Sequence, residues 1–471
     1  MNEKSENATE TQSPKPSSSS NWYWSLFVLA LLLVGGYFWW VNSIKTKPQI
    51  TLLGENTSNL EAISTLVGEY SSKSPVEVRV LPHTFDDAFK KSTQDFSAGT
   101  GRYDIVMQYN FSLSAFVQNG WVVTLDELVK GVPSSRLSFE DKLFENAWRE
   151  VGWYYKDPQD HDEGIQRVGY PFASNTMLLV YNKKLFEDRE LVQNYNDRFG
   201  TELSPPRTWD EYKRLAEFFT MPERGTHGVC LEGAVGGWLY YDFTNFLFGQ
   251  GGGVLEKERG WQGNADTPVI LDSTEALKAT KFFVDLKPFN AGNFFATDQF
   301  EKLQIMQNGK AAMAFMWSDT IPSLLEKNGQ DFGFAPIPGD KSILAGGAFF
   351  VNKDSKHIEE ARDFVLYLMQ EEQQVKLTVA GLCSAMRTVY DNPEVKELPY
   401  AEALRSSLER GVYMLEAGPD SELISNVLTT HLQRMWGNKE SVEEGLKFAA
   451  EEIESQRAKV FKLLDQSANE R

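Results

Sequence analysis

The side chains of this sequence that could bind a small molecule are polar and aromatic residues placed shortly after apolar runs. They are Glu55, Asn56, Tyr109, Asn110, Trp317 and Asp319. A molecule with flat apolar C–H faces rimmed by hydroxyl groups needs aromatic rings for the faces and planar polar side chains for the rim. In an exposed loop the same polar residues would have no such role, and a tryptophan is as often a core residue. Their position after predicted strands favours a binding role without settling it.

Apolar runs and helical segments alternate in the first part of the chain. Strands are predicted at 49–53, 76–81 and 104–108. Helices are predicted at 58–71, where apolar residues recur at helical spacing, and at 86–96. Strands that alternate with helices predict a mostly parallel sheet with helices on both faces. Ligands bind such sheets beyond the carboxyl ends of the strands, so the residues that follow the strands are the ones to consider.

Length and composition restrict the class of protein. The chain has 471 residues, which is too long for one compact core and suits two lobes or domains with an appendage. Hydrophobic residues make up 41% and charged residues 24%, as in ordinary globular proteins. The net charge of −19 disfavours general attraction to nucleic acid or to an anionic membrane surface. No nucleic-acid partner is therefore expected.

The two cysteines, Cys230 and Cys383, match neither a zinc site nor a CxxC redox motif. The favoured interpretation is two buried thiols that act as small hydrophobic side chains. Pairing would need a fold that brings them together, and their spacing leaves that open. No metal site and no cofactor are predicted.

The N-terminal part differs in composition from the rest of the chain. Residues 1–21 are polar and rich in serine, which predicts a disordered tail. Residues 22–41 contain no charged side chain, and a helix of that length spans a bilayer core of about 30 Å. Aromatic residues stand at both ends of the stretch, as they do at membrane interfaces. A transmembrane helix within 22–44 is therefore predicted, as a retained anchor or an uncleaved signal.

Three motifs carry more specific information when they are taken in order. They are YDIVMQYNFSLSAFVQNGWVVTLDEL at 103–128, YPFASNTMLLVYNKKLF at 170–186 and PPRTWDEY at 205–212. In the third motif Thr208 is a predicted helix N-cap with Glu211 three residues on, which is the pattern of a capping box. Together the motifs resemble bacterial extracellular solute-binding proteins, the family of maltose-binding protein. The segments 306–313 and 332–348 resemble later parts of the same family.

The resemblance implies an α/β fold with two lobes, of the type II-like periplasmic-binding-protein class, preceded here by the one N-terminal transmembrane helix. The lobes would be discontinuous in sequence and joined by hinge crossings. The first lobe would comprise residues 48–172 with 347–381. The second would comprise residues 176–345 with 386–465.

The resemblance also adds residues to the expected ligand site. They come from the crossings between the lobes and from the start of an aromatic helix in the second lobe. These residues are Ser174, Asn175, Trp238, Tyr241, Gly347 and Arg387. For the two aromatic residues, packing inside the second lobe is the alternative interpretation.

By this resemblance the chain is expected to be the substrate-binding receptor of an ABC importer that closes two lobes around a carbohydrate, and not an enzyme. Its partners would be a membrane permease and a separate ATPase, because the chain has no GxxxxGK[ST] P-loop of its own. A monomer, anchored to the cytoplasmic membrane with its soluble part outside the cytoplasm, is expected. Lys45 and Lys47 favour the opposite orientation only weakly, because long domains cross membranes largely regardless of such charges.

Three other functions stay open at this stage. The tyrosine pairs Tyr154–Tyr155 and Tyr240–Tyr241 could ligate a ferric ion or another hard cation in a receptor of the same fold. A glycosidase would need two carboxylates at a fixed separation, and acidic residues are so plentiful that pairs prove nothing. A ligand-binding sensory or adaptor domain would have the same sequence features as a transport receptor.

Overall fold

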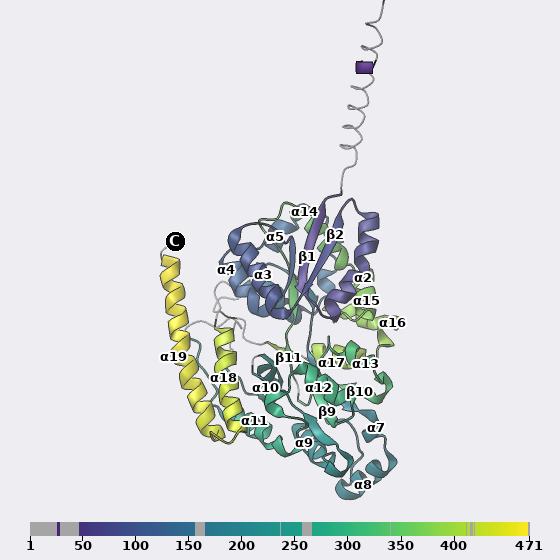
Figure 1. The fold of residues 1–471 in the computed structure, drawn as a ribbon, viewed down its shortest axis with the longest axis vertical. Coiled ribbons are helices and arrows are strands. Elements are labelled where there is room, and N and C mark those ends of the chain that lie inside the picture. Colours follow the sequence, from purple (N-terminus) through teal and green to yellow (C-terminus); the bar gives the residue numbers. More distant parts are fainter. Residues whose placement is uncertain are drawn as a thin grey trace, which may run out of the picture. The chain divides into compact units, whose positions relative to one another are not determined.

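The structure is a computed structural model of residues 1–471 (Figure 1). It describes residues 26–28, 47–155, 165–235, 237–256, 266–339, 341–410, 412–414, 418 and 420–469. The chain forms two compact units, 1–48 and 49–471, and the account below concerns the second. The predicted tail at 1–21 and, apart from the helical residues 26–28, the predicted membrane helix at 22–44 lie outside the described residues. Among the helices that are described, none is long and apolar enough to cross a bilayer.

The first sheet has five strands in the order β2-β1-β3-β12-β6. These strands are β1 (Gln49–Glu55), β2 (Glu77–His83), β3 (Ile105–Tyr109), β6 (Tyr170–Ala173) and β12 (Gly347–Val351). β1 is parallel to β2 and β3, whereas β12 runs antiparallel to β3 and β6. Helix α2 (Ser58–Lys73) connects β1 to β2, and α3 (Phe85–Ala98) connects β2 to β3. The strands and helices predicted between residues 49 and 108 are therefore confirmed.

The second sheet has four strands in the order β10-β7-β9-β8. These strands are β7 (Met177–Asn182), β8 (His227–Cys230), β9 (Ala311–Trp317) and β10 (Phe332–Ala335). β7 is antiparallel to β9 and β10, and β8 is parallel to β9. Leu178 and Val180 belong to one buried apolar cluster and Leu179 to another. Because neighbouring side chains of a strand point to opposite faces, both faces of this sheet are buried.

Helices cover both sheets, and the C-terminal pair packs on the second one. α18 (Ser421–Trp436) and α19 (Val442–Asn469) lie side by side (Figure 1) and contact α10 (Gly237–Gly249) and α11 (Thr274–Asp285). Other long helices are α8 (Arg189–Phe199), α9 (Trp209–Phe218), α12 (Gln299–Gln307), α14 (Ile358–Leu368), α15 (Glu371–Val379) and α17 (Ala401–Arg410). The segment 387–396 contacts α15, whereas α17 contacts β7 and β10.

Two local predictions are confirmed. Thr208 Oγ1 accepts a hydrogen bond from the Glu211 amide at 3.2 Å, and the Glu211 carboxylate accepts one from the Thr208 amide at 3.0 Å, so a capping box begins α9. Cys230 and Cys383 are both buried and free. Burial raises the pKa of each thiol, which keeps the two side chains in their neutral form.

The chain passes between the two sheets near the carboxyl ends of β1, β3 and β9. Only residues 174–176 separate β6 from β7, and residues 345–346 separate β11 (Ser342–Leu344) from β12. The Ala345 amide donates to the Asn175 carbonyl at 2.9 Å, and the Ser174 amide donates to the Cys383 carbonyl at 2.8 Å. Three segments far apart in sequence therefore lie side by side, next to the ends of β1, β3 and β9.

Candidate functional site

The end of β1 and the end of β3 supply the first half of the candidate site. Glu55 is the last residue of β1 and Tyr109 the last of β3, and these two strands are parallel neighbours. The Tyr109 hydroxyl donates to Glu55 Oε2 at 2.6 Å. Sequence placed both residues after strands, and the tertiary structure joins them through this hydrogen bond.

The second half comes from the loop after β9 and from the first passage between the sheets. Asn175 Nδ2 donates to Asp319 Oδ2 at 2.8 Å, and Asn175 Oδ1 accepts from Asn59 Nδ2 at 3.2 Å. Ser58 Oγ lies 3.0 Å from the carbonyl oxygens of both Asp319 and Gly381. The start of α2, which belongs to the first sheet, is therefore in direct contact with the loop that ends the second sheet's strand β9.

The ionisable groups of the two halves influence one another. Burial, with the negative charge of Glu55 as a further cause, raises the pKa of Asp319 to about 7. Burial also raises the pKa of Glu55, although the hydrogen bond from Tyr109 opposes this shift. The pKa of Tyr241 rises to about 12 because the ring is buried and Glu55 lies near it. Glu55, Tyr109, Asp319 and Tyr241 thus form one electrostatic cluster, drawn from both sheets.

Aromatic rings lie beside this cluster. The Tyr241 ring packs edge-to-face on the Trp317 ring, with centroids 5.6 Å apart and an angle of 79° between the planes. Trp238 lies three residues before Tyr241 on α10, and its ring is 6.4 Å from that of Phe300, which is exposed. Both predicted residues of α10 are intermediate between buried and exposed.

The remaining predicted residues have different environments. Asn110 and Ser174 are buried, and the Asn110 amide donates to the Gly346 carbonyl at 3.2 Å. Gly347 packs so closely that a Cβ atom there would lie 2.5 Å from the Gln108 carbonyl oxygen. Asn56 is exposed and donates its backbone amide to His83.

Arg387 has no described contact with the cluster. Its guanidinium is exposed and donates to the Asp141 carbonyl oxygen at 3.2 Å. Sequence reasoning missed Ser58 and Asn59, which begin the helix directly after Glu55 and Asn56. Their place at the N-terminus of the helix after a predicted strand was the signal that could have found them.

Comparison with known proteins decides the family. Residues 54–375, more than half of the chain, match the sequence profile of bacterial extracellular solute-binding proteins. The chain belongs to this family.

Relatives within and around the family share the fold at low identity. The maltotriose-binding protein of Pyrococcus abyssi is 22% identical over 386 residues, which cover 77% of this chain and 71% of that protein. A solute-binding protein from Agrobacterium radiobacter K84 in complex with ribitol has a TM-score of 0.71 and 21% identity, over 87% of this chain and 98% of its own. Maltose-bound MalE3 of T. maritima has a TM-score of 0.70 and 22% identity, and the match covers 87% of this chain and 99% of MalE3. The expected two-lobed α/β fold is thereby confirmed.

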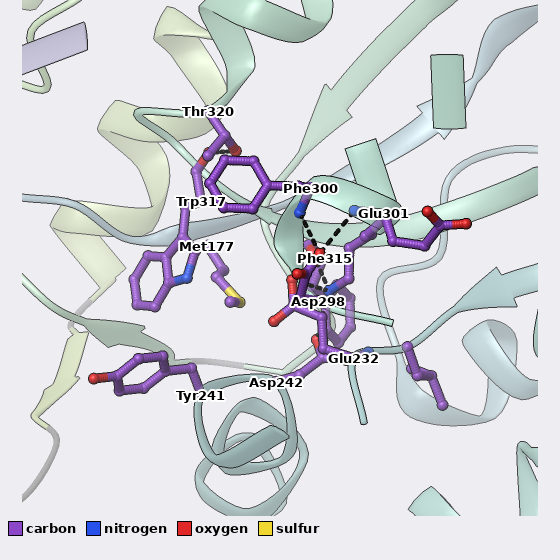
Figure 2. A network of polar contacts seen from close by, with 12 residues as sticks. Met177, Glu232, Tyr241, Asp242, Asp298, Phe300, Glu301, Phe315, Trp317 and Thr320 are labelled. Atoms are coloured by element: carbon purple, nitrogen blue, oxygen red, sulfur yellow. Dashed lines mark hydrogen bonds and ion pairs between the residues drawn. The ribbon is translucent and has the colours of Figure 1, made fainter. Parts of the chain in front are cut away.

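This solute-binding protein also has a buried charge network behind α10 (Figure 2). Lys302 Nζ lies 3.1 Å from both Glu232 Oε1 and Asp242 Oδ1, and it donates to the Phe315 carbonyl at 2.8 Å. The Glu232 amide donates to Asp242 Oδ2 at 2.8 Å. Figure 2 shows Tyr241 and Trp317 beside the network. The network therefore fixes α10, which carries Trp238 and Tyr241, against α12 and the end of β9.

The network contains two acids and one base, all almost fully buried. Burial raises the pKa of Glu232 to about 8, although Lys302 opposes this shift. Glu232 Oε2 has no hydrogen-bond partner among the described residues. Burial raises the pKa of Asp242 as well, and Lys302 opposes this shift too.

Replacement of Lys302 by Met should destabilise the protein strongly. Because two buried acids would lose the cation that contacts both of them, we expect the free energy of unfolding to fall by about 3–5 kcal/mol in urea denaturation at pH 7. Glu232→Gln and Asp242→Asn added together should recover part of this loss. Lys278→Met on the exposed face of α11 is the matched control, with a change within about 0.5 kcal/mol. A Lys302→Met protein as stable as the control would contradict the role given to this network.

The pKa of Asp319 predicts how stability depends on pH. Its pKa is near 7 in the folded protein against an ordinary value of 3.8, so the folded state holds a proton that the unfolded state has lost between these values. The side chain therefore lowers stability progressively as pH rises from about 4 to 7. Asparagine does not ionise, so the variant lacks this loss of stability. The free energy of unfolding of Asp319→Asn minus that of wild type should therefore be roughly 2 kcal/mol larger at pH 8 than at pH 5.

Denaturation at the two pH values measures this difference directly. Asp272→Asn, an exposed aspartate before α11, is the matched control and should show no such gain. If the two variants show the same change in the free energy of unfolding between pH 5 and pH 8, Asp319 has an ordinary pKa.

Proposed function

We propose that this protein is the substrate-binding receptor of an ABC importer and that it binds a carbohydrate where its two sheets meet. One observation carries the proposal. Acceptors and donors from both halves of the site, Glu55, Tyr109 and Asp319, lie near Tyr241, a residue that is partly exposed. Sugars need this combination of planar polar groups and aromatic rings. The relatives named above bind maltotriose, ribitol and maltose, which supports a sugar or polyol as the ligand.

Binding would proceed by closure of two lobes, with boundaries proposed at 48–172 with 347–381 and at 176–345 with 386–465. A ligand favours the closed form only if it binds that form better than the open one. Ligand groups that contact Glu55 from the first sheet and Asp319 from the second satisfy this condition, because only closure brings both within reach. Hinge closure of this kind is general for periplasmic binding proteins.

The proposed partners follow from the family. The closed receptor would deliver its ligand to a membrane permease driven by a separate ATPase, and it would do no chemistry on the ligand. The helix predicted within 22–44 would hold the receptor on the outer side of the cytoplasmic membrane. Such an anchor would raise the effective concentration of the receptor at its permease.

A thermal-shift screen of residues 48–471 tests the proposal, because 49–471 form one compact unit. The compounds are mono- and oligosaccharides, polyols, amino acids and ferric citrate. A ligand at about 100 times its Kd should add roughly 2.7 kcal/mol of stability. We expect a rise in melting temperature with one class of sugar or polyol. A rise with ferric citrate or amino acids alone, or with no compound, would overturn the carbohydrate assignment.

Removal of the Tyr241 ring tests the location of the site. Tyr241→Ala should weaken binding of the sugar found in the screen at least tenfold, which is about 1.4 kcal/mol, measured by calorimetry. Tyr181→Ala on β7 is the control, because this ring packs on Phe186 at 4.9 Å and lies outside the cluster. Unchanged affinity in the Tyr241→Ala protein would place the site elsewhere.

A further inference from the structure

Among the described residues, the two carboxylates of the candidate site are contacted by neutral groups. Glu55 receives a hydrogen bond from Tyr109, and Asp319 receives one from Asn175. Both donors are neutral. In the part of the chain that the structure describes, neither carboxylate forms an ion pair with a lysine, an arginine or a histidine.

The surroundings add negative charge and little positive charge. Asp86 lies close enough to Glu55 to raise its pKa further, and Glu55 and Asp319 repel each other across the site. His83 is the neighbour of Glu55 on β2, and the Cys383 thiol lies near Asp319. Tyr109 and Tyr241 are the other titratable groups that face the cluster, and burial keeps both neutral.

The buried acids on and near α10 differ from the acids of the candidate site, because a lysine contacts them. There Lys302 contacts both Glu232 and Asp242, so the buried acids have a cation of their own. Arg387, which the family resemblance placed at the ligand site, donates to the Asp141 carbonyl oxygen instead. The protein therefore supplies a counter-charge for one buried acidic pair and not for the pair at the site.

Closure on a neutral molecule would bury two like charges without compensation, which is costly unless a proton is taken up. A ligand with a positive charge would remove this cost. An ammonium group is also attracted to the faces of tyrosine rings, and Tyr241 at the site is partly exposed. We propose that the ligand carries a protonated nitrogen and is an amino sugar or another polyhydroxylated amine. This inference rests on the proposed function and specifies its substrate class.

Matched ligands that differ only at nitrogen test the inference. The protein is titrated calorimetrically at pH 6.5 with three sets of ligands. The first set is glucose, glucosamine and N-acetylglucosamine. The second is cellobiose and the glucosamine disaccharide, and the third is sorbitol and 1-amino-1-deoxysorbitol. We expect the amine of at least one set to bind ten or more times more tightly than its hydroxyl and acetylated counterparts. For that set, Asp319→Asn or Glu55→Gln should reduce the preference to threefold or less, whereas Asp272→Asn should keep it. The two site variants together keep the test decisive if one of them fails to fold.

The pH dependence gives a second readout. Between pH 6 and 8, binding of the alkyl amine should strengthen relative to sorbitol, because ionised Asp319 attracts the cation. Neutral ligands that bind as tightly as the amines in every set would overturn the inference and leave the receptor function intact. If neither neutral nor amino carbohydrates bind, the proposed function itself is overturned.

Discussion

The two sheets depend on one buried amide at the point where the chain passes between them. Asn175 donates to the Asp319 carboxylate and accepts from Asn59 at the start of α2, and its backbone carbonyl accepts from Ala345 in the return passage. A primary amide can do this because it offers donors and an acceptor on one planar group. Asn175 is almost fully buried, so each lost bond would leave a polar group unpaired. The positions of both halves of the site follow from this arrangement.

Buried charge is organised in two ways around this point. The acids Glu232 and Asp242 are held by Lys302 and serve to fix α10 behind the site. Glu55 and Asp319 receive hydrogen bonds from the neutral side chains of Tyr109 and Asn175, which oppose the rise in pKa that burial causes without cancelling it. Among the described residues, a cation therefore contacts the acids behind α10, and neutral donors contact the acids of the candidate site. Perturbed acids of this second kind are concentrated at functional sites in proteins generally.

The fold is shared with relatives of about 20% identity that bind molecules as different as ribitol and maltose. Strand order and crossings are therefore compatible with many ligands, and specificity has to come from the side chains at the strand ends. In this chain those side chains are carboxylates and aromatic rings. Two of these strand ends, Tyr109 and Trp317, also belong to the apolar cores that stabilise the sheets.

The sequence by itself determined the elements whose signals are local. Apolar runs predicted β1, β2 and β3, the Thr208–Glu211 pair predicted the start of α9, and ordered motifs indicated the family. Only the tertiary structure decided which polar residues meet: Asn175 reaches Asp319 over 144 residues, and Lys302 reaches Asp242 over 60. It also showed that Arg387 binds a carbonyl away from the cluster. The physical reason is that periodicity and capping act within a few residues, whereas side-chain pairs across sheets depend on how distant segments pack.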